Sequence, residues 1–145
     1  MNINKDDLFY VCTMIEYVSR RTHNKCKDIV AKIPDDELEH QLKVAEINHC
    51  LPFEQVSDEW IEQFGINNGT FDNITSCRYK VPSVTSIGRV YQRLIMFTRQ
   101  HLMNCRKWLE NKAFMRFSGN NEFHVIYRSF TLFFMKMGTS WGQNQ

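Results

Sequence analysis

An acidic row in the middle of the sequence is the first feature whose residue types and spacing could do chemistry. Carboxylates that recur every three or four residues share one side of a helix. The members of this acidic face are Glu54, Asp58, Glu59 and Glu62. Such a face either points into solvent or binds a partner that carries basic side chains, and both interpretations stay open.

A row of basic residues lies in a longer amphipathic stretch, Ser83 to Lys112, and most of the row is outside the apolar face of that stretch. The members of this basic stripe are Arg89, Arg93, Arg99, Arg106 and Lys107. Cationic side chains in a row can neutralise phosphates, which supply most of the affinity for nucleic acids. Nucleic-acid binding is therefore the alternative hypothesis, although no helix-turn-helix pattern accompanies the stripe.

The histidines and cysteines do not form a catalytic or metal-binding pattern. The five cysteines (Cys12, Cys26, Cys50, Cys77 and Cys105) include no Cys-x-x-Cys pair. His49 and Cys50 are neighbours, but adjacent positions of a helix point in different directions, so we expect a structural histidine. No glycine-rich phosphate loop is present. The sequence thus favours a protein that is not an enzyme, with no catalytic, cofactor-binding or metal-binding residues.

The charges are distributed unevenly along the chain. Residues 1–75 carry seven Lys or Arg and 14 Asp or Glu, which gives a net charge of −7. Residues 76–145 carry 11 Lys or Arg and two Asp or Glu, which gives a net charge of +9. Such asymmetry indicates a charged partner. The alternative is that the two halves, or two copies of the chain, neutralise each other.

The length and composition indicate one intracellular domain. A chain of 145 residues with 43% hydrophobic and 23% charged residues can bury one core. We expect a single domain over residues 1–137, with an acidic half (1–75) and a basic half (76–137), and a disordered tail over 138–145. The chain opens without a secretory signal and has no membrane-spanning apolar run, so we expect a cytoplasmic protein that does not bind membranes.

Apolar residues at helical spacing predict five helices up to residue 112. They are expected at Asn4–Arg21, Lys25–Ile33, 34–48, 53–64 and Ser83–Lys112. Asn4 and Asn24 are the expected N-caps of the first two helices, and Ser83 or Ser86 that of the last. Gly88 disfavours helix, which suggests a later start for the last one.

An aromatic row near the end of the chain has two interpretations. Its apolar side chains are Phe123, Ile126, Tyr127, Phe130, Phe133, Phe134 and Met137. We prefer a sixth helix over 121–137, whereas the aromatic content also permits a strand paired with 114–117. The fold class expected is mainly α, a compact single-domain bundle of five to six helices, with a possible short β-hairpin near 114–130.

Three runs in the first 65 residues form a further pattern together with His49, namely Phe9–Tyr17, Asp28–Ile33 and Val56–Ile61. In these runs the chain resembles a family of short helical proteins of unknown function from gut bacteria. Members are often encoded beside toxins with an ADP-ribosyltransferase-like fold, which implies an antitoxin-like role. The resemblance supplies no catalytic residues, and the chain departs from it beyond Cys77.

These observations lead to one preferred hypothesis. The chain is expected to be a bacterial protein–protein interaction module, with an antitoxin-like role as the specific form. Its partner would be the product of a neighbouring gene or a second copy of itself. Either the acidic face or the aromatic row would hold that partner.

Overall fold

A computed structural model of the chain describes residues 4–75 and 80–109, and within them five helices and no strand. The helices are α1 (Lys5–Thr22), α2 (Cys26–Lys32), α3 (Asp35–Asn48), α4 (Phe53–Gln63) and α5 (Val84–Leu109). The mainly α fold is therefore confirmed. The sixth helix, the alternative hairpin and the tail lie outside the described residues.

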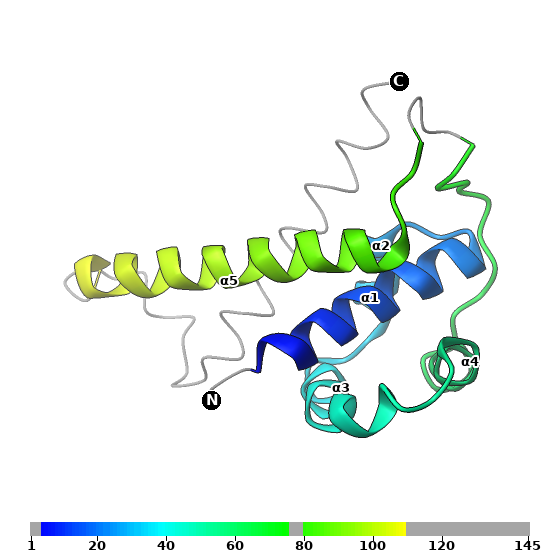
Figure 1. Cartoon of the computed structure of the whole chain (residues 1–145), viewed down its shortest axis with the longest axis horizontal. Coiled ribbons are helices and arrows are strands. Elements are labelled where there is room, and N and C mark those ends of the chain that lie inside the picture. Colours follow the sequence, from blue (N-terminus) through cyan, green and yellow to red (C-terminus); the bar gives the residue numbers. More distant parts are fainter. Residues whose placement is uncertain (1–3, 76–79, 110–145) are drawn as a thin grey trace.

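Helix α1 is the centre of the fold because it contacts each of the other four helices. Figure 1 shows α5 along one side of α1 and helices α3 and α4 on the opposite side. Almost every side of α1 is consequently buried, including the polar residues Thr13, Glu16 and Ser19. A helix buried all round must satisfy such polar groups within the protein.

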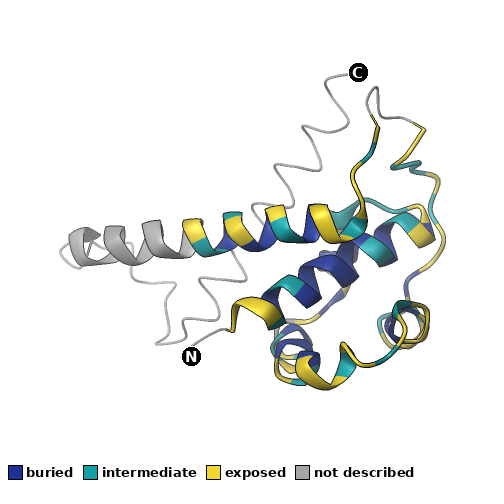
Figure 2. Cartoon of the chain, viewed as in Figure 1, coloured by how far each residue is buried: buried dark blue, intermediate teal, exposed yellow. Residues whose placement is uncertain are grey.

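A single cluster of buried side chains joins the five helices (Figure 2). Its largest fully buried members are Trp60, Leu8, Met14, Ile15, Ile29, Ile33 and Ile95. Trp60 brings a polar group into this interior, and its indole Nε1 donates a hydrogen bond to Gln41 Oε1 at 3.0 Å. Because that bond satisfies the indole nitrogen, Trp60 can bury its large ring without leaving an unpaired donor.

The ends of α1 follow the capping rules that the sequence indicated. Asn4 Oδ1 accepts a hydrogen bond from the Asp6 amide at 2.8 Å, so Asn4 is the N-cap as expected. The helix ends at His23, which adopts the left-handed conformation with φ of 55°.

The expected cap of α2 at Asn24 is wrong, since Lys25 occupies the N-cap position of α2. Asn24 instead donates from Nδ2 to the carbonyl of Asn67 at 2.8 Å.

The segment after α4 is held against the body of the protein. Gly65 takes the left-handed conformation beyond the end of α4, with φ of 60°, which glycine adopts without strain. Further along, the amides of Gly69 and Phe71 donate to the carbonyls of Thr22 and His23 at 2.8 and 2.9 Å. These bonds tie the connection between α4 and α5 to the end of α1.

Helix α5 begins at Val84, four residues before the glycine that was expected to delay it. Ser83 Oγ accepts a hydrogen bond from the Ser86 amide at 3.2 Å, so the serine cap is confirmed. Gly88 is inside the helix because α5 passes very close to α1 there. A Cβ atom on residue 88 would collide with Thr13 Oγ1 and would lie 2.9 Å from Thr13 Cα.

We expect Gly88→Ala to lower the free energy of unfolding. An alanine inside a helix normally adds about 0.5–1 kcal/mol of stability relative to glycine. Here the added methyl group meets the backbone of Thr13, and forcing α1 and α5 apart should give a net loss of about 1–3 kcal/mol. Urea denaturation followed by circular dichroism measures the difference.

Arg93→Ala is the matched control, since Arg93 is an exposed position of the same helix. It should change the free energy of unfolding by less than about 0.5 kcal/mol. Adding Thr13→Ala to the Gly88→Ala variant removes the nearer contact and should recover part of the loss. A Gly88→Ala protein more stable than the wild type would show that the close approach is wrong.

Candidate functional site

The acidic face of α4 is exposed over its whole length. Glu54, Asp58, Glu59 and Glu62 all reach solvent. On the other side of the same helix Val56, Ser57 and Trp60 are buried. The spacing of 54, 58 and 62 places three carboxylates in one row, one helical turn apart. The structure therefore brings the predicted acidic residues together on one surface.

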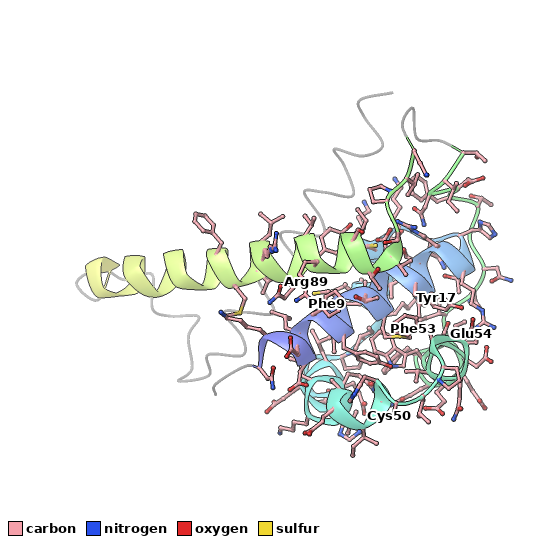
Figure 3. All side chains as sticks on the ribbon, in the orientation of Figure 1. Phe9, Tyr17, Cys50, Phe53, Glu54 and Arg89 are labelled. Carbon is pink, nitrogen blue, oxygen red and sulfur yellow. The ribbon has the colours of Figure 1, made fainter. Side chains whose placement is uncertain are left out.

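Helix α1 engages the beginning of this row. Arg21 pairs with the Asp58 carboxylate at 2.7 Å and donates to the Glu54 carbonyl at 3.1 Å. Tyr17 lies against the same turn (Figure 3), where burial and then the negative charge of Glu54 raise the pKa of its hydroxyl. The cation that meets the acidic face thus comes from the acidic half of the chain itself.

The far end of the acidic face is less occupied. Glu59 Oε1 accepts a hydrogen bond from Gln55 Nε2 of its own helix at the long distance of 3.4 Å. In the portions of the chain that are described, no lysine or arginine pairs with Glu59 or Glu62. Glu59 and Glu62 are therefore the members of the face most open to a basic partner.

The basic stripe of α5 is interrupted in its described part. The guanidinium of Arg89 lies over the ring of Phe9, 3.8 Å from its centroid (Figure 3). Arg93 is exposed, and Val90 and Phe97 on the same helix are exposed as well. The side chains of Arg99, Arg106 and Lys107 lie outside the described residues. Arg89 is thus partly exposed and packs against α1.

A polar network that the sequence did not reveal lies between α1, α2 and the start of α5. Glu16 is only 7% exposed, and its carboxylate accepts from Arg20 Nε at 2.8 Å and from Cys26 Sγ at 2.9 Å. Arg20 also donates to the Pro82 carbonyl at 2.8 Å. Burial, and then Glu16, raise the pKa of the Cys26 thiol. In the sequence this network is indicated by Glu16 and Arg20, which lie four residues apart within an amphipathic segment.

His49 and Cys50 lie in the turn between α3 and α4, and the expected separation of the two side chains is wrong. Helix α3 ends at Asn48 with His49 as its C-cap, so Cys50 lies beyond the helix. His49 is exposed and lies 3.8 Å from the sulfur, measured from Nε2 to Cys50 Sγ. The buried apolar side of α3 ends at Ala45.

The described residues offer no group of three or more His, Cys, Asp or Glu side chains arranged to hold a metal ion. A helix with the length and apolar character needed to cross a membrane is also absent from this part of the chain. No known protein family, curated protein or solved structure matches this sequence. The functional argument therefore depends on the surfaces and contacts described above.

We expect Arg20→Leu to destabilise the protein far more than Arg21→Leu. Removing Arg20 leaves the buried Glu16 carboxylate without its cation, which costs about 3 kcal/mol. Arg21 and Asp58 are 37% and 66% exposed, and such surface pairs contribute less than about 1 kcal/mol. Urea denaturation of both variants measures the contrast. Equal losses would contradict the structural role assigned to the Glu16 network.

Proposed function

We propose that this chain is a helical protein–protein interaction module that binds a basic partner through the acidic face of α4. The observation that carries the proposal is the exposure of Glu54, Asp58, Glu59 and Glu62 on a helix whose opposite side is anchored in the core. A rigid helix that presents a row of carboxylates supports electrostatic recognition, since the charges are already in position before binding.

The charge of the α1–α4 region supports the same partner. Residues 1–75 carry a net charge of −7. Of the α5 arginines with described side chains, Arg89 contacts Phe9 and Arg93 is exposed. Arg20 and Arg21 do pair with carboxylates, but both belong to α1 and are already included in the net charge of −7. A net negative surface of this kind accelerates association with a positively charged protein.

The resemblance of residues 1–65 makes an antitoxin-like role the specific form of this proposal. The partner is then a toxin encoded by a neighbouring gene of a bacterium, and the complex forms in the cytoplasm. Val56 and Trp60, which belong to the resembling run Val56–Ile61, are buried, whereas Asp58 and Glu59 in the same run are exposed. The run therefore supplies both the anchor of α4 and part of its binding face.

Glu62→Lys should weaken the complex with the product of the neighbouring gene by about tenfold, equivalent to about 1.4 kcal/mol. Glu59→Lys together with Glu62→Lys should weaken it further. Titration calorimetry at low and high salt measures both effects, and raising the salt should weaken the wild-type complex.

Glu46→Lys is the matched control, because Glu46 is an exposed acid on α3 and the substitution makes the same charge change. It should leave the affinity within about twofold, as expected for a charge outside the contact surface. If the wild-type protein is co-expressed with the products of its neighbouring genes and purifies without any of them, that result would contradict the proposal. Salt-sensitive retention on RNA or DNA that Arg93→Ala reduces would favour the nucleic-acid alternative instead.

A further inference from the structure

The exposed side of α5 carries large apolar residues on both sides of an arginine. Val90 and Phe97 are 45% and 71% exposed, and Arg93 between them is exposed as well. These positions are three and four residues apart, so the three side chains share one side of the helix. We call Val90, Arg93 and Phe97 the outer face of α5. The opposite side of the helix, with Ile87 and Ile95, belongs to the core.

Helices α4 and α5 carry charges of opposite sign. The α4 sequence contains four acidic residues and no lysine or arginine, which gives a charge of −4. The α5 sequence contains five lysine or arginine residues and no acidic residue, which gives a charge of +5. The acidic face of α4 is therefore complementary in charge to α5.

The two helices do not neutralise each other within one copy. Helix α1 lies between them (Figure 1), and Figure 3 shows Glu54 on the side of α1 away from α5. Axes of packed helices are about 8–10 Å apart, so two such layers separate α4 from α5 by about 20 Å. That separation exceeds the Debye length of about 8 Å at physiological ionic strength. Among the described residues, no carboxylate pairs with Arg93.

The apolar residues distinguish between possible occupants of the outer face. A nucleic-acid backbone offers phosphates to an arginine but no apolar surface to Val90 and Phe97. The acidic face of α4 has both, because the partly exposed Ile61 lies one helical turn after Asp58. Protein interfaces combine apolar contacts at their centre with charged groups around them. The surface that matches the outer face in both respects is thus present on the chain itself.

We propose that α5 of one copy docks through its outer face on the acidic face of α4 of a second copy. Arg93 then pairs with Glu59 or Glu62, while the apolar residues beside it pack against Ile61. The contact is head-to-tail, because the two faces lie on opposite sides of α1. Each copy can consequently hold one neighbour on each side. The inference rests on the proposed function in one respect, which is that the acidic face is a binding surface.

Analytical ultracentrifugation of the protein alone tests this contact. The average mass should rise with protein concentration at low salt and fall towards that of the monomer at high salt, because salt screens the charges. Arg93→Glu and Glu62→Lys should each weaken the self-association by at least about tenfold. A wild-type protein that stays monomeric at every concentration at low salt would overturn the proposal.

Lys80→Glu is the matched control for Arg93→Glu. Lys80 is exposed and lies before the start of α5, and the substitution makes the same charge change. It should leave the self-association constant within about twofold, as expected for a charge outside the contact. An equal effect of Lys80→Glu and Arg93→Glu would show that net charge alone drives association, which would overturn the docking of these two faces.

A mixture of the Arg93→Glu and Glu62→Lys proteins tests which faces meet. The first variant keeps an intact acidic face, and the second keeps an intact outer face, so the two should bind each other although neither associates strongly alone. Binding in the mixture also shows that both variants are folded. If circular dichroism shows two folded variants and the mixture remains monomeric, the proposal is overturned.

Phe97→Ala separates a second copy from other occupants of the outer face. The substitution should weaken self-association by about tenfold, as for an aromatic residue in a contact, and should leave the urea midpoint of a dilute sample unchanged. A lower midpoint with unchanged self-association would assign the face to residues 110–145 of the same chain. Retention on RNA or DNA by a protein that does not self-associate would assign it to nucleic acid. Either result would overturn the proposal.

The inference and the proposed function fail on different measurements. A protein that self-associates but never purifies with the product of a neighbouring gene retains the head-to-tail contact and contradicts the toxin partner. A protein that purifies with that product but stays monomeric by itself retains the partner and overturns the head-to-tail contact.

Discussion

The close contact between α1 and α5 at Thr13 and Gly88 is the constraint on which the rest of the structure depends. It brings the longest described helix against the central one, where Gly88 has no side chain and faces the backbone and side chain of Thr13. Ile87, Tyr91 and Ile95 of α5 then reach the same core that α2, α3 and α4 cover from other directions. A glycine within a helix is unfavourable, but the tighter packing offsets this cost. Van der Waals attraction between buried atoms is lost when even a small gap separates them.

The interior contains polar groups that set how the helices are arranged. Glu16 binds Arg20 of its own helix and Cys26 of α2, while Arg20 reaches the carbonyl of Pro82 just before α5. Trp60 of α4 and Gln41 of α3 make a second such link. Burying polar groups is unfavourable unless they are paired, so these bonds disfavour other packings of the same apolar faces.

The placement of the charges follows from the same packing. Arg89 of α5 contacts Phe9 of α1, whereas Arg21 of α1 pairs with Asp58 of α4. The acidic face of α4 remains exposed, and in the described residues no lysine or arginine pairs with its Glu59 or Glu62. The question raised by the uneven charge of the chain is answered in part, since the described arginines of α5 do not neutralise this face.

The sequence by itself determined the helices, because their signals are local. Asn4 and Ser83 cap the helices they were expected to cap, and the apolar spacing placed the helix boundaries from α1 to the start of α5 within about one position, in keeping with how helix ends fray. The predicted end of the last helix at Lys112 lies outside the described residues. The exposed row on α4 was equally visible, since one helix contains all of it. Only the tertiary structure decided the burial of Glu16, the need for Gly88 and the contact of His49 with Cys50. The first two arise where segments distant in sequence meet, and the third arises where a helix ends, so helical spacing carries no information about them.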